Sequence, residues 1–165
     1  PYREASRINI HRDTWGTNLY QQINWWAPVS NVEEKNTMIF YPDYFDVPVK
    51  NTTSTWDLNI YLANRKKGDF SYPSAPQLKE DLPSNIKIVP VTIKPGEILC
   101  FSGAHLHSSS KEKSENTRIS FEIRTICEND LNSSAQAPNV DCDLQWKFPK
   151  IFKKINDNSP LKITS

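Results

Sequence analysis

Apolar and polar residues alternate in several short stretches of the chain, a pattern typical of half-buried β-strands. The clearest stretch is TRISFEIRTI at 117–126, where Ile119, Phe121 and Ile123 share one face and polar residues occupy the other. We expect the apolar face of this stretch to pack against the rest of the protein and the polar face to meet water or a polar cavity. The same reasoning predicts strands at 7–13 and 85–93. Apolar, aromatic-rich stretches ended by prolines predict strands at 19–29 and 37–42, and the apolar stretch 98–103 predicts a buried strand.

The stretches between these strands are mostly polar and contain many prolines. Residues 46–87 are interpreted as a loop-rich insertion, with a short helix around 56–68. The tail from residue 127 has no clear pattern until LQWKFPKIFKKI, a basic and weakly amphipathic stretch that we interpret as a solvated terminal segment. Short strands without intervening helices predict a mainly β, antiparallel sandwich or barrel in one domain, 1–165.

Composition excludes several classes of protein. The chain of 165 residues has 20 basic and 19 acidic residues, so it lacks the basic excess expected of a nucleic-acid-binding protein. No apolar run is as long as a membrane span, which argues against a membrane protein. Cys100, Cys127 and Cys142 are odd in number and widely spaced, which fits neither a disulfide framework nor a zinc site. We therefore expect a reducing, cytoplasmic setting.

The three histidines are the main candidates for chemistry. His11 and Asp13 lie two residues apart, so a strand would direct both side chains to the same face. One more imidazole would complete two histidines and one carboxylate, the facial triad of non-haem Fe(II) oxygenases. His105 and His107 follow a glycine turn and also share a face, and either one is a candidate for that third position.

The residues after His107 carry a more specific pattern. Arg118 lies eleven residues after His107, and Ser120 two residues further on. This spacing resembles the Fe(II)- and 2-oxoglutarate-dependent dioxygenases, and three segments are similar to the phytanoyl-CoA dioxygenase-like branch. They are VEEKNTMIFYPDYF at 32–45, KPGEILCFSGAHLHSS at 94–109 and ENTRISFEIRT at 115–125. The glycine that this branch usually carries after the asparagine of the first segment is Thr37 here.

The resemblance implies a double-stranded β-helix, or jelly-roll, with a few short helices. It implies iron held by His11, Asp13 and His107, and 2-oxoglutarate anchored by Arg118 and Ser120, because a guanidinium matches a carboxylate bidentately. His105 is then a neighbour of the site, a pocket residue or a packed core imidazole. The implied reaction uses O2 and hydroxylates an unactivated C–H bond of a small molecule, and the presence of Asp13 argues against halogenation.

Several other residues are secondary candidates. Gln22 and Asn24 share a face of the predicted strand 19–29, and they hydrogen-bond either the cosubstrate or the interior of the barrel. Arg124 shares the face of Arg118 and is a second candidate for binding a carboxylate, whereas Arg12 is expected in solvent or a loop. Three aromatic residues are expected in the core rather than in a pocket wall: Trp15, Trp26 and Tyr41.

Two other functions remain open from the sequence. A cupin-type metalloenzyme would keep the metal ligands without using 2-oxoglutarate, and a non-catalytic jelly-roll would bind its ligand in a tryptophan-lined groove. The chain starts ten residues before His11, where the resemblance leads us to expect further helical and strand structure, so a truncated domain and a compact member of the group both remain open. The sequence does not identify the substrate or the oligomeric state. It also does not distinguish hydroxylation from desaturation or cyclisation.

Overall fold

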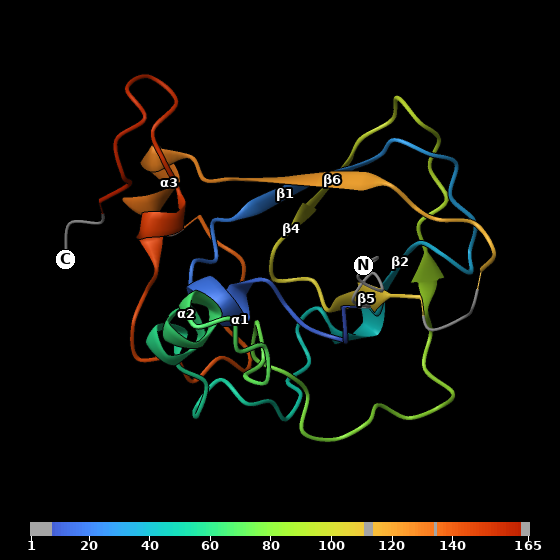
Figure 1. The fold of residues 1–165 in the computed structure, drawn as a ribbon, viewed down its shortest axis with the longest axis horizontal. Helices are drawn as coiled ribbons and strands as arrows, with labels where there is room; N and C mark the ends of the chain where they lie inside the picture. Colours follow the sequence, from blue (N-terminus) through green and yellow to red (C-terminus); the bar gives the residue numbers. More distant parts are fainter. Residues whose placement is uncertain (1–7, 111–113, 134, 163–165) are drawn as a thin grey trace.

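The computed structural model describes residues 8–110, 114–133 and 135–162, and it is mainly β (Figure 1). Its strands form two small antiparallel sheets, each of three strands. The first sheet has the order β4 (Leu99–Ser102), β1 (Ile23–Pro28) and β6 (Ser120–Thr125). The second has the order β3 (Val89–Pro90), β2 (Met38–Phe40) and β5 (His107–Ser109).

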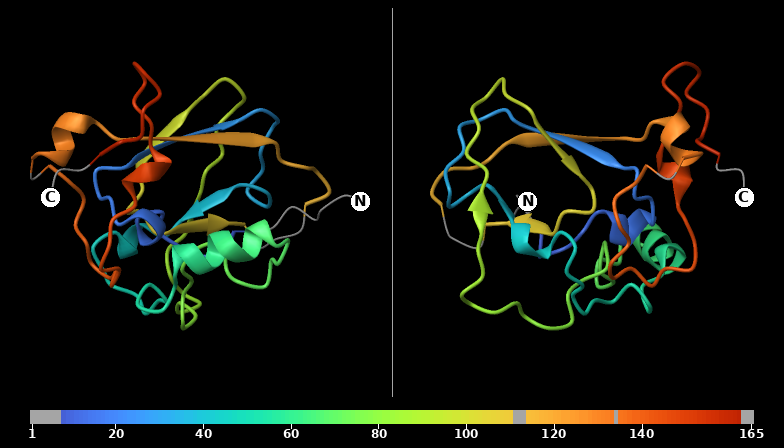
Figure 2. Two further views of the ribbon diagram at one scale, coloured as in Figure 1. Left: turned by 60° about the vertical axis from the view of Figure 1, so that its left-hand side comes forward. Right: turned by 180° about the vertical axis from the view of Figure 1, so that it is seen from behind.

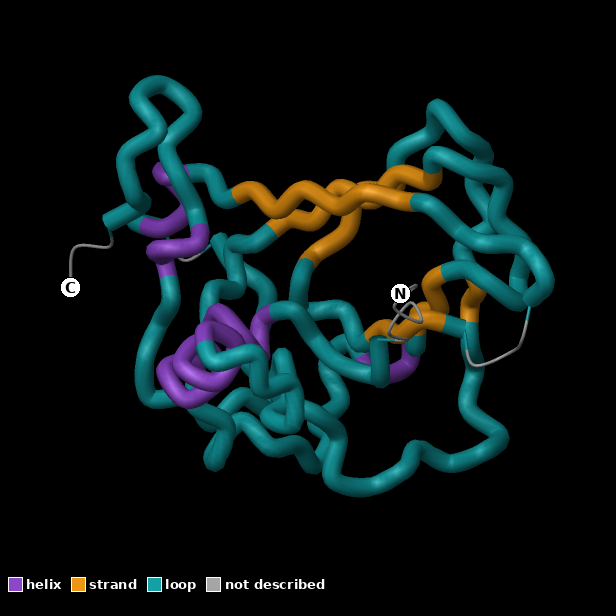
Figure 3. The backbone as a smooth tube through the Cα atoms, viewed as in Figure 1, coloured by secondary structure: helices purple, strands orange, loops and turns teal. Residues whose placement is uncertain are grey.

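The helical elements are short and lie outside the two sheets. Three are α-helices: α1 (Thr14–Thr17), α2 (Leu58–Lys66) and α3 (Glu128–Leu131). Two are 3-10 turns: η1 (Pro42–Tyr44) and η2 (Pro149–Ile151). Long loops join these elements over much of the chain, as Figure 3 shows in teal. Among the described residues, no helix is long and apolar enough to cross a membrane.

Several predicted elements are found near their expected positions. β1 lies within 19–29 and ends at Pro28, and β2 lies within 37–42, where Pro42 opens the η1 turn. α2 lies within the predicted helix 56–68 and begins after Asp57, whose carboxylate accepts from the backbone N–H groups of Asn59 and Ile60. Outside α2, the region 46–87 contains mainly turns and loops, as expected.

Three strand predictions are wrong in part. In place of a strand at 7–13, the structure has only a single bridge between His11 and His107 before α1 begins. The stretch 85–93 forms a ladder over Val89–Pro90 alone. β4 falls within 98–103 but is not a buried strand, because it lies at the edge of its sheet and only Phe101 is buried.

The orientation of β6 also differs from expectation. Its apolar residues face outward, and Ile119, Phe121 and Ile123 are 58%, 48% and 54% exposed. Ser120, Glu122 and Arg124, on its other face, line a cavity between the sheets. Figure 2 shows β6, in orange, opposite the second sheet. Alternation correctly grouped the residues of each face, but it does not determine which face a sheet turns inward.

The buried apolar residues form three clusters. The largest contains Trp15, Tyr20, Ile39, Tyr41, Leu106, Cys142 and Leu144. A second contains Trp26, Met38, Val91 and Phe101, and a third contains Leu19, Phe152 and Leu161. All three aromatic residues expected in the core are buried. The tail from residue 127 is not simply solvated, because it supplies four of these buried side chains.

The expectation that Arg12 lies in solvent is also wrong, because its side chain is almost completely buried. Its partners come from segments about 30 to about 130 residues away in sequence, which a local pattern does not reveal.

Candidate metal centre

His11, Asp13 and His107 converge in the interior, and all three are buried. One ligand atom from each lies within 4.8 Å of the others. His11 Nε2 is 3.6 Å from Asp13 Oδ1, and His107 Nε2 is 3.5 Å from Asp13 Oδ2. Both imidazoles therefore direct the same ring nitrogen toward one carboxylate, and the three together are able to hold a metal ion.

Backbone pairing brings the two histidines together. The N–H of His11 donates to the carbonyl of His107 over 2.9 Å, and the N–H of His107 donates to the carbonyl of His11 over 3.0 Å. Asp13 follows as the residue that precedes α1, and its carbonyl accepts from the N–H of Gly16. The isolated bridge between His11 and β5 thus places ligands ninety-six residues apart in sequence side by side.

The second ring nitrogen of each histidine is held by the backbone. His11 Nδ1 lies 2.8 Å from the carbonyl oxygen of Asn9, and His107 Nδ1 lies 2.9 Å from that of His105. Because a carbonyl only accepts, each Nδ1 carries the proton and each Nε2 of a neutral ring has a free lone pair. Metal-binding histidines are usually oriented by such a hydrogen bond.

The charged and titratable groups of the cluster shift one another's pKa values. Burial works to raise the pKa of Asp13, but its hydrogen bond with His11 and the positive charges of His107 and Arg124 lower it below its usual range. Burial and the neighbouring His11 lower the pKa of His107 to about 4. Burial also opposes protonation of His11, yet its hydrogen bond with Asp13 raises the pKa of that ring. Near neutral pH, the cluster contains a carboxylate beside a neutral His107.

Asp13 is oriented by a chain of buried amides from β1 and the segment before it. Gln22 donates to Asn24 over 2.8 Å, and Asn24 donates to Asp13 Oδ2 over 2.5 Å. A side chain at Gly103 would place its Cβ 2.8 Å from Gln22 Nε2, so any other residue there would displace the Gln22 amide. Gln22 and Asn24 thus lie within the interior and hold Asp13, and neither lines the cavity.

Arg124 contacts the cluster from β6. Its Nη2 lies 2.7 Å from Asp13 Oδ1, and its Nε lies 2.8 Å from Glu122 Oε1. Burial and the negative charge of Asp13 raise the pKa of Glu122. Glu122 was not among the predicted site residues. It alternates with Arg118 and Arg124 on the polar face of 117–126, and this position on the same face is the signal by which Glu122 could have been predicted.

A cavity of about 210 Å³ lies beside the cluster. Both sheets line it, with Trp26, Ser120, Glu122 and Arg124 on one side and Met38, His107 and Ser108 on the other. Arg118 also lines this cavity, and its guanidinium carbon is 5.6 Å from the centre of the Trp26 ring. Arg118 Nη1 is buried and has no hydrogen-bond partner among the described residues. Burial also lowers the pKa of this guanidinium.

His105 lies outside the cluster, although it is only two residues from His107. Its ring is half-buried against Phe45 and Phe40, and its Nδ1 lies 3.1 Å from the carbonyl oxygen of Ser102. Of the two histidines that follow the glycine turn, His107 is therefore the one that meets His11 and Asp13.

Comparison with known proteins adds no family to this description. No family model matches the chain, and no curated protein matches it. What the structure establishes is a buried triad of two histidines and one carboxylate, compatible with a non-haem iron site, in a mainly β protein.

Proposed function

We propose that the protein is a non-haem Fe(II)- and 2-oxoglutarate-dependent oxygenase with a jelly-roll fold. The observation that carries this proposal is the pairing of the His11–Asp13–His107 cluster with Arg118 in the adjoining cavity, where the buried Nη1 of its guanidinium has no hydrogen-bond partner among the described residues. Its preferred substrate is a small molecule, hydroxylated at an unactivated C–H bond.

The donor set of the cluster suits Fe(II). Two neutral imidazoles and one carboxylate on one side of an ion leave the other side open, as in the facial triad. When bound, Fe(II) with 2-oxoglutarate supplies the activation of O2, with 2-oxoglutarate converted to succinate and CO2 and one oxygen atom inserted into the substrate. His11, Asp13 and His107 would hold the ion, and Gln22 and Asn24 would keep Asp13 oriented.

The cavity suits a dicarboxylate. A buried N–H without an acceptor costs about 1–3 kcal/mol, so the orphaned Nη1 of Arg118 favours a ligand that supplies an oxygen. Ser120 lines the same cavity and offers a hydroxyl to the same carboxylate. The buried Trp26 ring lies beside the Arg118 guanidinium, and an apolar neighbour of this kind strengthens a charge-assisted hydrogen bond.

The two alternative functions receive less support. A cupin-type metalloenzyme that does not use 2-oxoglutarate has no role for an unpartnered Arg118 in the cavity. A tryptophan-lined binding groove is not favoured, because Trp15, Trp26 and Trp56 are buried and Trp26 alone among the tryptophans lines the cavity beside the cluster.

Anaerobic addition of Fe(II) and 2-oxoglutarate tests the proposal directly. We expect a weak visible charge-transfer band that requires both additions and disappears in Arg118→Ala. A protein that binds Fe(II) without forming the band would favour the cupin alternative, and one that binds no Fe(II) would favour the non-catalytic one. Succinate formation with a panel of small metabolites, with His107→Ala as the blank, then identifies the substrate class.

A further inference from the structure

Arg12 lies between the two candidate ligands His11 and Asp13, and its side chain is only 2% exposed. Arg12 is joined by one peptide bond to His11 and by another to Asp13. Fixing the Arg12 side chain therefore also restrains the backbone from which His11 and Asp13 project into the cluster.

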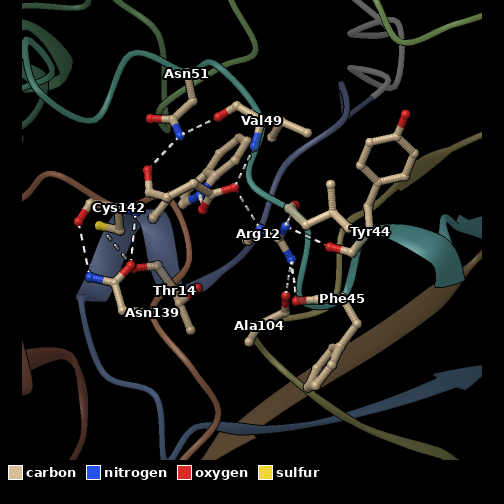
Figure 4. Close-up of polar contacts among 12 residues, drawn as sticks. Arg12, Thr14, Tyr44, Phe45, Val49, Asn51, Ala104, Asn139 and Cys142 are labelled. Atoms are coloured by element: carbon tan, nitrogen blue, oxygen red, sulfur yellow. Dashed lines mark hydrogen bonds and ion pairs between the residues drawn. The ribbon is translucent and has the colours of Figure 1, made fainter.

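All five N–H groups of the Arg12 guanidinium have an acceptor. Four donate to backbone carbonyls, and Figure 4 shows this group among Tyr44, Phe45 and Ala104. The shortest two bonds, each of 2.6 Å, reach the carbonyls of Tyr44 and Ala104. The other two reach the carbonyls of Val47 and Phe45. Since Ala104 lies three residues before His107, Arg12 links the segments that carry all three candidate ligands.

The fifth N–H, at Nε, donates to Asp141 Oδ2 over 3.1 Å. Asp141 is itself fixed, because its side chain is 4% exposed and accepts two further hydrogen bonds. Trp15 Nε1 donates to its Oδ1 over 2.7 Å, and the N–H of Val49 donates to its Oδ2 over 3.1 Å. The tail beyond residue 127 thus supplies the only charged partner that the structure gives to Arg12 within the described residues.

A contribution to folding stability does not by itself explain the buried ion pair of Arg12 and Asp141. Burying two charges costs several kcal/mol per ion, and well-packed apolar residues often replace such a pair without loss. What apolar residues cannot reproduce is the fixed direction of five hydrogen bonds from a planar group. The arrangement therefore suits a requirement for precise placement of the neighbouring residues.

We propose that Arg12 and Asp141 are positioning residues for the metal centre, and that they act through the backbone on His11 and Asp13. This inference rests on the proposed metal-binding function. It assigns the tail a role at a site that it does not touch: the tail sets how tightly, and in what geometry, the cation is held.

Co(II) binding to the full-length chain tests this inference, because the ion reports affinity and ligand geometry through its visible absorption. The test variant is Asp141→Asn, which keeps the shape of the side chain but replaces one acceptor with a donor. The matched control is Asp143→Asn, the same change two residues further on at an exposed position. We expect Asp141→Asn to raise the Kd for Co(II) about tenfold and to shift its bands, as changes behind metal ligands commonly do. We expect the control to match the wild type.

Circular dichroism separates loss of fold from loss of placement. A folded Asp141→Asn protein with wild-type Kd and bands overturns the inference. If that variant does not fold, Trp15→Phe decides, because it removes one hydrogen bond to Asp141 and keeps a buried ring. A folded Trp15→Phe protein with unchanged bands and Kd then overturns the inference, and shifted bands support it. Wild-type protein that binds no Co(II) would instead contradict the proposed function.

Discussion

The side chains around the His11–Asp13–His107 cluster fall into two groups that differ in how fully their hydrogen-bonding capacity is used. In the first group, which holds the cluster in place, Arg12 uses all five of its N–H groups and Asn24 and Gln22 form a continuous chain to Asp13. In the second group, which lines the cavity, Arg118 has a buried nitrogen without a partner. The comparison separates residues that complete the protein's own structure from residues suited to a ligand.

Loss of a ligand is the largest effect that this comparison predicts. His107→Ala removes one of three converging donors, so we expect metal binding and succinate formation to be undetectable. His105→Ala is the control, because His105 lies outside the cluster and contacts Phe45 and Phe40. Binding of Fe(II), measured by equilibrium dialysis, should be unchanged in the control. Loss of binding in His105→Ala with retention in His107→Ala would reverse the assignment.

Removal of the unpartnered guanidinium is expected to have the next largest effect. Arg118→Met should raise the KM for 2-oxoglutarate about 10- to 100-fold, the range expected when a hydrogen bond to a charged group is lost. The Kd for Fe(II) should not change, since Arg118 does not contact the cluster. Thermal unfolding should show no loss of stability, because the variant removes a buried unpaired donor. A stability loss with unchanged KM would place Arg118 in the first group instead.

Metal binding should depend on pH through one histidine. Asp13 raises the pKa of His11 above the ordinary value of an imidazole, so the ring takes up a proton as pH falls through that raised pKa, and the proton then competes with the metal. His107, with a pKa of about 4, stays neutral over this range. The Kd for Co(II) should therefore rise about tenfold for each pH unit well below the His11 pKa, and should level off at higher pH. A rise of about a hundredfold per unit between pH 5 and 6 would mean that both histidines compete.

The amide chain behind Asp13 should have a more moderate effect. Asn24→Ala removes a hydrogen bond to a metal ligand, and we expect the Kd for Fe(II) to rise about tenfold. Gln21→Ala is a suitable control, because Gln21 bonds the exposed Gln136 rather than the cluster. If Asn24→Ala instead raised only the KM for 2-oxoglutarate, Asn24 would belong with the ligand-binding group.

The smallest effect is expected on the outer face of β6. Ile123→Thr should change the free energy of unfolding by less than about 0.5 kcal/mol, because Ile123 is more than half exposed. Phe101→Ala, in β4 at the opposite edge of the same sheet, is the buried comparison, and it should cost about 3–5 kcal/mol. Urea denaturation measures both values. A large loss for Ile123→Thr would show that this face is covered in solution.

The sequence predicted local features better than the relations between distant segments. Alternation located β6, and apolar, aromatic-rich stretches that end at the prolines at positions 28 and 42 located β1 and β2. The resemblance of the spacing from His107 to Arg118 to the dioxygenase pattern selected the histidine that meets His11 and Asp13. These signals depend on periodicity and short separations, which the sequence records directly.

The rest depended on contacts that the sequence does not record. Alternation in 117–126 identified two faces but not which one lies inside, since the two choices differ by a single-residue shift of register. The environment of Arg12 depends on four carbonyls and on Asp141, at separations of up to 129 residues. Nothing in the residues adjacent to Arg12 indicates that those acceptors will gather around it.

The inward polar face of β6 makes the strand's own pairing unusual. A one-residue displacement of β6 along β1 would turn Phe121 and Ile123 into the interior and expose Ser120 and Arg124 to water. The hydrophobic effect alone would favour that displaced pairing. The attraction between Arg124 and Asp13 and the bond from Trp25 to Thr125 oppose that displacement. These polar contacts, one of which reaches a candidate metal ligand, thus also fix the alignment of the sheet, and a protein without them would be expected to fold with this strand turned over.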